Sequence, residues 1–125
     1  MKKNILLLTY LIGLAAIMSF TFTDFEKTLI GKWKLQATQS PGKAAINVNE
    51  KFDMFYEFKS DFSYLESGDG ANVKGKWRIS DSIYLEMKHS TRDFTDKVKL
   101  TYIEPDKLEM THPNNRKFIF TRVQY

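Results

Sequence analysis

Two short segments of the chain each place a histidine two residues after a methionine. LEMKH occupies residues 85–89 and LEMTH occupies residues 108–112, and together they contain both histidines of the chain. A thioether and an imidazole are ligands that suit Cu(I). Side chains two residues apart in a strand project to the same face. Each segment therefore predicts a methionine and a histidine on one face, and this pairing raises the hypothesis of a copper site.

A metal site needs the two segments to converge. If the two segments end strands that have one other strand between them, their backbones lie about 9–10 Å apart. Long side chains could still converge across this distance, and the candidate ligands are Met87, His89, Met110 and His112. Met54 could add a further sulfur ligand. The alternative is simpler, because Leu-x-Met is what any half-buried strand needs and a histidine at a strand end usually enters a solvated loop. Glu86 and Glu109 fall on the opposite face, so we expect no metal and no cofactor.

Catalytic motifs are missing from the sequence. It contains no nucleophile elbow, no Gly-rich phosphate loop and no His-Glu-x-x-His pattern. Glu57 and Glu66 lie near aromatic residues, but a lone carboxylate on a strand is expected to face solvent. Acid–base chemistry would need two carboxylates with different pKa values, and the sequence does not indicate such a pair. We expect that the protein is not an enzyme.

The elements that must position these side chains are strands, because apolar residues recur at every second position. Trp33, Leu35 and Ala37 alternate in this way, as do Ile83, Leu85 and Met87, with charged or more polar residues between them. This pattern is typical of antiparallel strands with one buried face. It predicts eight strands, at residues 30–38, 51–59, 62–66, 73–79, 83–89, 97–104, 107–111 and 117–123.

The connections between these strands alternate in length. In an up-and-down barrel, alternate connections lie at opposite ends. The sequence therefore predicts one end with tight turns, at 60–61, 80–82 and 105–106. It predicts an opposite end with longer loops, at 39–50, 67–72, 90–96 and 112–116. Loops on a rigid scaffold are where binding residues usually lie, and the long first loop could act as a lid.

A second repeat marks the tight-turn end. GKWKL at 31–35 recurs as GKWRI at 75–79. Trp33 starts the first strand, Trp77 is close to the end of the fourth, and Arg122 is close to the end of the eighth, so all three are expected at the same end. We interpret them as a structural plug of the barrel, with the guanidinium stacked on an indole.

These residues resemble those of a known family. Gly31-Lys32-Trp33 after a short N-terminal turn is similar to the Gly-x-Trp opening of lipocalins, and Arg122 is similar to the arginine that packs over that tryptophan. Residues 28–123 resemble the compact, secreted lipocalin-like domains of Gram-negative bacteria. The resemblance implies an eight-stranded antiparallel barrel that binds small, mostly apolar molecules. The chain is shorter than typical animal lipocalins and lacks their later helix and disulfide.

The interior of such a barrel either is filled or holds one small ligand. We expect a small apolar or amphipathic ligand at the looped end, because the inward residues there include methionines, which line adaptable apolar sites. The alternative is a filled barrel that acts as a protein-interaction or inhibitor module, since ten aromatic residues, Tyr102 among them, are expected to point inward. The candidate ligand-binding residues are Phe52, Met54, Tyr64, Met87, Leu100, Met110 and Phe118.

The N-terminal segment differs from the rest. Residues 1–23 start with Lys2 and Lys3 and continue with an apolar stretch, a pattern typical of a secretory signal peptide, with an uncleaved anchor as the alternative. Residues 24–125 are then one barrel domain, secreted or periplasmic. Without the two N-terminal lysines, 17 basic side chains face 15 acidic ones, so nothing indicates a nucleic-acid partner. The chain has no cysteine, so its core alone must hold the fold.

Overall fold

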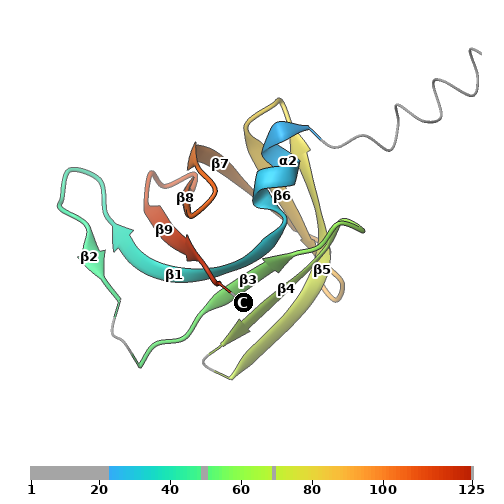
Figure 1. Ribbon diagram of the computed structural model, residues 1–125, viewed down its shortest axis with the longest axis horizontal. Helices are drawn as coiled ribbons and strands as arrows, with labels where there is room; N and C mark the ends of the chain where they lie inside the picture. The colour runs from blue at the N-terminus through green and yellow to red at the C-terminus, as the bar shows by residue number, and fades with distance from the viewer. Residues whose placement is uncertain (1–22, 49–50, 69, 125) are drawn as a thin grey trace, which may run out of the picture.

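The computed structural model describes residues 23–48, 51–68 and 70–124, and they form one closed antiparallel sheet. Strand order follows the sequence, and β1 closes the barrel by pairing with β9 as well as with β3. The predicted eight-stranded up-and-down barrel is confirmed (Figure 1). Its elements are α2 (Asp24–Leu29), β1 (Gly31–Gln39), β2 (Ile46–Asn47), β3 (Phe55–Phe58), β4 (Ser63–Gly68), β5 (Ala71–Ser80), β6 (Tyr84–His89), β7 (Thr95–Ile103), β8 (Lys107–Thr111) and β9 (Lys117–Arg122).

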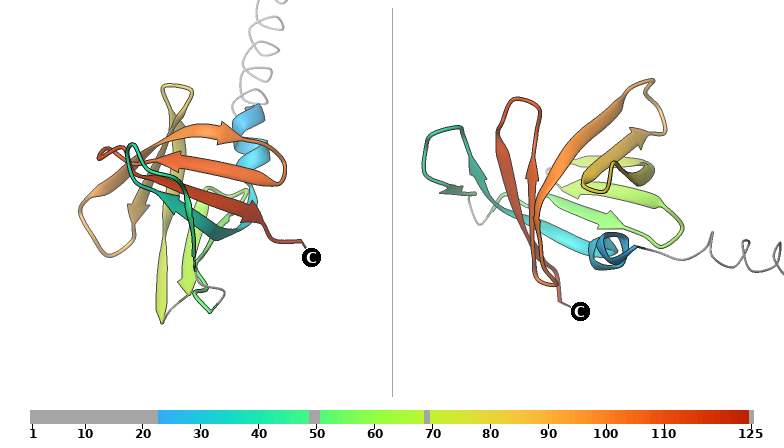
Figure 2. Two further views of the ribbon diagram at one scale, coloured as in Figure 1. Left: turned by 90° about the vertical axis from the view of Figure 1, so that its left-hand side faces the viewer. Right: turned by 90° about the horizontal axis from the view of Figure 1, so that it is seen from above.

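The first long connection contains an additional short strand. After the β-bulge between Leu35 and Ala37, β1 leaves β3 and pairs with β2, with Thr38 opposite Ile46. β2 and α2 consequently lie at opposite ends of β1 (Figures 1 and 2). In this conformation residues 40–47 are exposed and extend the sheet outward. The lid expected at 39–50 is therefore seen only in an extended position, and residues 49 and 50 lie outside the described part.

Two expectations about the connections and the interior were wrong. The predicted loop at 67–72 is a tight hairpin, because Ser67 pairs with Asn72 and Gly68 with Ala71. Tyr102 was expected inside, but it is exposed. A bulge between Leu100 and Tyr102 adds one residue to β7, and one residue reverses the side-chain parity of everything after it.

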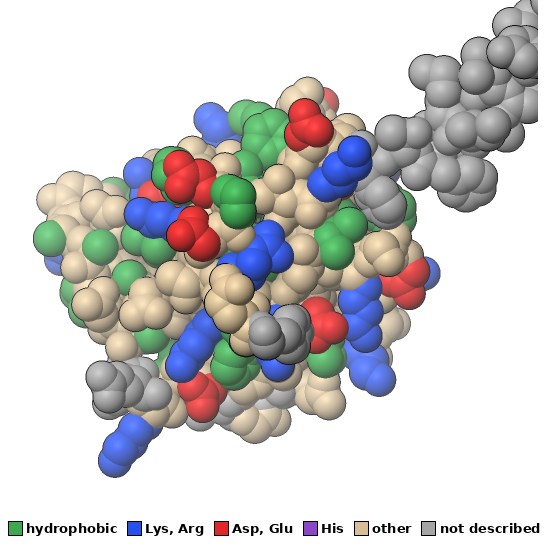
Figure 3. Space-filling view, viewed as in Figure 1, with side chains coloured by type: hydrophobic (Ala, Val, Ile, Leu, Met, Phe, Trp, Pro, Cys, Tyr) green, Lys and Arg blue, Asp and Glu red, His purple; other side chains and the backbone are tan. Residues whose placement is uncertain are grey.

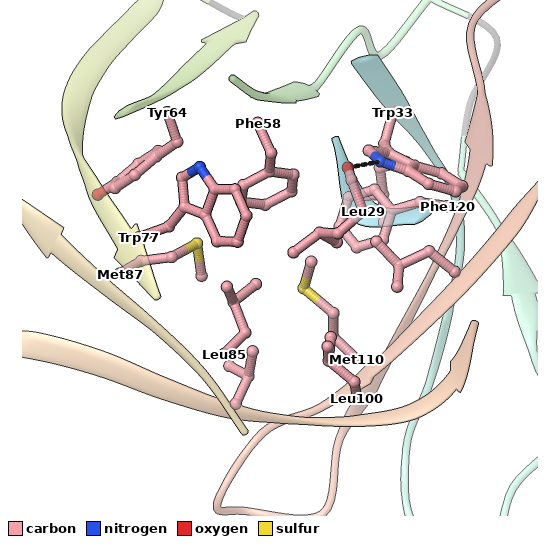
Figure 4. Packing of buried hydrophobic residues seen from close by; sticks show 13 residues of the cluster. Leu29, Trp33, Phe58, Tyr64, Trp77, Leu85, Met87, Leu100, Met110 and Phe120 are labelled. Carbon is pink, nitrogen blue, oxygen red and sulfur yellow. Dashed lines mark hydrogen bonds between the residues drawn. The ribbon is translucent and has the colours of Figure 1, made fainter. Parts of the chain in front are cut away.

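The short helix α2 closes the end of the barrel where the tight turns lie, which we call the closed end. Thr23 caps the helix, because its Oγ1 accepts a hydrogen bond from the Glu26 amide at 3.2 Å. Leu29, the last helical residue, is fully buried. In Figure 4 it lies among the side chains of the barrel interior, so α2 contributes to the core as well as covering it.

The core is a single cluster of apolar and aromatic side chains inside the barrel. Phe58 packs edge-on against Trp77, with ring centroids 5.9 Å apart, and Met87 and Met110 lie beside them (Figure 4). The buried members come from all eight main strands of the barrel and from α2. They are Leu29, Trp33, Leu35, Phe58, Tyr64, Trp77, Leu85, Met87, Val98, Leu100, Leu108, Met110 and Phe120.

The outer surface is polar and mixed in charge. On the face shown in Figure 3, basic and acidic side chains lie side by side, so this face carries no large area of one sign. The predicted signal segment at residues 1–23 lies outside the described residues, except for Thr23. Among the residues that are described, no helix is long and apolar enough to cross a membrane.

Candidate ligand-binding site at the looped end

The closed end is held by hydrogen bonds from buried side chains. Trp33 Nε1 donates to the Leu29 carbonyl at 2.8 Å, and Trp77 Nε1 donates to the Lys59 carbonyl at 3.1 Å. The Arg122 guanidinium lies over the Trp33 ring, 4.2 Å from its centroid. It donates to the carbonyls of Thr28, Ile30 and Pro105. The structure thus places the three plug residues at the closed end, where Trp33 and Arg122 bind the helix to the barrel and Trp77 binds the connection between β3 and β4.

The first Gly-x-Trp glycine makes room for this arrangement. A Cβ on Gly31 would lie 2.2 Å from Arg122 Nη1, and the residue has a φ of +139°. Only glycine combines that backbone conformation with so close an approach. The glycine at position 31 therefore leaves space for the arginine.

The candidate ligand-binding residues divide into two groups. Tyr64, Met87, Leu100 and Met110 are fully buried in the core, with exposed fractions of 4% or less. Three others are half-buried and pack against that core at the looped end, and we call them the apolar rim. The apolar rim consists of Phe52, Met54 and Phe118.

Polar side chains gather at the looped end, and we call them the polar cluster; their burial ranges from Tyr64, which is buried, to Asp96, whose side chain is 48% exposed. They share the inward parity of buried neighbours: Glu66 follows Tyr64 on β4, His89 follows Met87 on β6, and Asp96 precedes Val98 on β7. His89 Nε2 lies 3.4 Å from Asp96 Oδ2, and the His89 ring meets the Tyr64 ring edge-on. The polar cluster consists of Tyr56, Tyr64, Glu66, His89 and Asp96.

The second Gly-x-Trp glycine serves this cluster. A Cβ on Gly75 would lie 2.6 Å from the Tyr64 ring and 2.2 Å from the Lys88 carbonyl oxygen. The absence of a side chain at Gly75 lets the Tyr64 ring cross β5 toward His89, which is the pairing partner of Gly75 on β6. The same short motif therefore supports the plug at one end and the polar cluster at the other.

The electrostatics of the polar cluster reflect its burial. Burial raises the pKa of the Glu66 carboxyl, and the nearby Asp96 raises it further, while His89, a hydrogen bond from Tyr56 and Arg92 oppose the shift. Burial and the charges of Glu66 and Asp96 raise the pKa of Tyr64 to about 12, and they raise the pKa of Tyr56 in the same direction. The charge of Asp96 on β7 therefore acts on groups of β3 and β4.

One member of the cluster lacks a partner. The Tyr64 hydroxyl is buried and has no hydrogen-bond partner among the described residues, although the side chain is only 2% exposed. A buried polar group left in this state costs about 1–3 kcal/mol. A group that donates to or accepts from this hydroxyl would recover that free energy.

The two Met-x-His segments contribute to the interior, as their parity predicted. Met87, His89 and Met110 are buried and His112 is half-buried. His112 packs edge-on against Phe118 at 4.5 Å, and burial lowers its pKa. Among the residues that the structure describes, no group of three or more His, Cys, Asp or Glu side chains could hold a metal ion.

Sequence reasoning misplaced two carboxylates. Glu66 was expected to face solvent, but it is half-buried and hydrogen-bonded to Tyr56; the inward parity of Tyr64 could have shown this. Asp96 was assigned to a loop, whereas β7 begins at Thr95. It therefore supplies the carboxylate on the histidine-bearing face that the sequence analysis did not find.

Comparisons with known proteins show the fold and little else. No family model and no curated protein matches the chain. A lipocalin-like protein from Bacteroides uniformis superposes with a TM-score of 0.63 at 16% identity, covering 77% of this chain and 99% of that one. An uncharacterized protein from Bacteroides eggerthii gives 0.62 at 16%, covering 76% and 99%. A protein from Burkholderia xenovorans gives 0.57 at 11%, covering 80% and 87%. At these identities the likeness establishes a shared barrel and not a shared ligand.

Proposed function

We propose that this lipocalin-like barrel binds a small amphipathic molecule at its looped end, without catalysis. One observation carries the proposal: the looped end holds two chemically different groups of side chains on different strands. The apolar rim lies on or beside β1, β3 and β9, and most of the polar cluster lies on β4, β6 and β7. An apolar chain and a polar group of one ligand could each meet a matching group of side chains.

The contrast with a purely structural core supports this proposal. A barrel that only needs to fold is best filled with apolar side chains, because buried polar groups are costly unless every one of them is paired. Here the buried Tyr64 hydroxyl is unpaired, and a half-buried carboxyl has a raised pKa. Unfavourable electrostatics of this kind gather at functional sites more often than elsewhere.

The test uses the uncharged apolar dye N-phenylnaphthylamine, whose fluorescence rises when it leaves water. We expect the full chain to increase its fluorescence in a saturable manner, and we expect Phe118→Ala in the apolar rim to weaken binding by about tenfold, since a buried aromatic contact contributes on the order of 1–2 kcal/mol. Phe25→Ala is the matched control, because Phe25 is exposed on α2 at the closed end. Equal loss in both variants, or no saturable binding, would contradict the proposal.

A second function is favoured by a different observation. Ile46 and Phe94 are 69% and 47% exposed, and both lie on connections at the looped end. Exposed apolar residues on loops of one end are a feature of protein-binding surfaces. Under this alternative the barrel is filled and its loops contact another protein. A double variant, Ile46→Ser with Phe94→Ser, should then abolish partner binding, and neither this variant nor the unsubstituted chain should bind the dye in a saturable manner.

A further inference from the structure

The donors and acceptors of the polar cluster are unequal in number. The carboxylates of Glu66 and Asp96 offer several acceptor positions. The donors directed at them are the Tyr56 hydroxyl, bound to Glu66, and His89 Nε2, close to Asp96. The unpaired hydroxyl of Tyr64 adds one unused donor and one unused acceptor, so acceptor positions still outnumber donors. A ligand group rich in donors and free of acceptors would complement this set.

The charges of the cluster point in the same direction. Two carboxylates lie at the looped end, and the charge of Asp96, whose side chain is 48% exposed, disfavours ionisation of Glu66. Two cations of this end come from exposed loops: Arg92 lies over the Phe94 ring at 5.6 Å, and Arg116 over the Phe118 ring at 5.5 Å. Burial lowers the pKa of His112, which disfavours its positive form. Arg92 and Arg116 are exposed, whereas the Glu66 carboxyl is half-buried.

Aromatic rings complete the surroundings. Tyr56 stacks on Phe58 with centroids 5.8 Å apart, and Phe58 lies 6.4 Å from Tyr64. The faces of such rings attract cations, most strongly where water is excluded. Carboxylates, an unpaired hydroxyl and aromatic faces together recognise an organic ammonium group.

We propose that the ligand carries a primary or secondary ammonium group, which donates hydrogen bonds to Glu66 or Asp96 and to Tyr64 Oη, while its apolar chain lies along Phe52, Met54 and Phe118. This inference rests on the proposed function and specifies the polar half of the ligand. It excludes fatty acids as preferred ligands, because a carboxylate would face the carboxylates of Glu66 and Asp96.

Three probes with the same apolar chain separate the inference from the function on which it rests. Octylamine, octanol and octanoate are titrated into the full chain by isothermal calorimetry at neutral pH. We expect octylamine to bind about tenfold tighter than octanol, which is the usual advantage of a charge-assisted hydrogen bond over a neutral one, and octanoate to bind weakest. Octanol or octanoate binding as tightly as octylamine would overturn the ammonium assignment and leave the proposed function in place. No binding of any probe would overturn both.

Variants of the polar cluster test whether it causes the expected preference for octylamine over octanol. Glu66→Gln keeps the shape and removes the charge, so we expect it to weaken octylamine about tenfold and leave octanol unchanged. Glu57→Gln is the matched control, because Glu57 is adjacent in the sheet but has the opposite parity to Tyr56 and Phe58. Tyr64→Phe gives an independent readout if Glu66→Gln folds poorly, and it should also weaken octylamine more than octanol. Equal effects of the Glu66 and Glu57 substitutions would contradict the inference.

Discussion

The buried aromatic residues at the two ends of the barrel differ in how their polar atoms are paired. At the closed end, both tryptophan ring nitrogens and the Arg122 guanidinium donate to backbone carbonyls. At the looped end, the Tyr64 hydroxyl is unpaired and burial raises the pKa of Glu66. Paired buried groups stabilise a fold, whereas unpaired ones reduce its stability. The comparison indicates that the closed end stabilises the fold. At the looped end, the unpaired buried hydroxyl lowers the free energy of unfolding, and a ligand that pairs with it could restore that free energy.

The largest effect is expected at the plug. Trp33→Ala removes a fully buried indole together with its bond to Leu29, so we expect the free energy of unfolding to fall by about 3–5 kcal/mol, as measured by urea denaturation. Ile46→Ala at the looped end is the control and should change it by less than about 0.5 kcal/mol. If Trp33→Ala does not fold, Trp33→Phe should show a smaller loss of the same sign. Similar losses in the free energy of unfolding for substitutions at both ends would contradict the view that the closed end is the stabilising end.

A smaller loss is expected when the guanidinium alone is removed. Arg122→Met keeps much of the side-chain volume but leaves the carbonyls of Thr28, Ile30 and Pro105 without this donor, so we expect a loss of about 2–3 kcal/mol. Hydrogen exchange sharpens the test, because the amides of Lys27 and Ile30 in α2 should lose more protection than those of β4. Uniform loss of protection would show that Arg122 does not act by holding the helix.

At the looped end a substitution should stabilise the protein. Tyr64→Phe deletes the unpaired buried hydroxyl without changing the ring, and we expect a gain of about 1 kcal/mol in the free energy of unfolding. Tyr84→Phe is the matched control; its ring lies on the outer face under Lys97, and the substitution should be nearly neutral. A loss of stability in Tyr64→Phe would mean that the hydroxyl is satisfied and that no ligand is needed to pair it.

The smallest effect concerns pH. Because the pKa of Glu66 is raised on folding, the stability linked to its proton is fully present below its unfolded-state pKa and is lost as the pH rises through the raised value. Glu66→Gln is uncharged throughout, so its melting temperature should exceed that of the unsubstituted chain by a few degrees at neutral pH and converge with it below a pH of about 4. A difference independent of pH would contradict the burial of an ionisable Glu66.

The sequence predicted the barrel well because one physical signal governs it. Alternation of apolar and charged residues locates every main strand, and strand direction alone brings Trp33, Trp77 and Arg122 to one end. The same alternation mispredicted the orientation of Tyr102, because the β-bulge before this residue adds one residue to the strand and has no periodic signal in the sequence. The hairpin at 67–72 was missed because Gly and Asn residues favour turns and also occur in long loops.

The candidate site was only half predictable. The apolar rim followed from strand parity, but Glu66 was judged by its residue type, for which exposure is the usual outcome. Asp96 was lost through an error of two residues in the start of β7. Neither the unpaired state of Tyr64 nor the use of Gly75 to admit its ring can be found without the neighbouring strands in place. The signal-peptide boundary and the single domain at 24–125 remain predictions.

The most direct test of a ligand at the looped end is native mass spectrometry of the full chain, purified under mild conditions from the cells that make it. We predict an additional mass of a small molecule that is released on denaturation, that carries an amine, and that is lost in the Tyr64→Phe and Glu66→Gln variants but kept in Tyr84→Phe and Glu57→Gln. A bare polypeptide in every preparation, with no gain in thermal stability from octylamine, would contradict the account and favour a filled barrel that binds another protein.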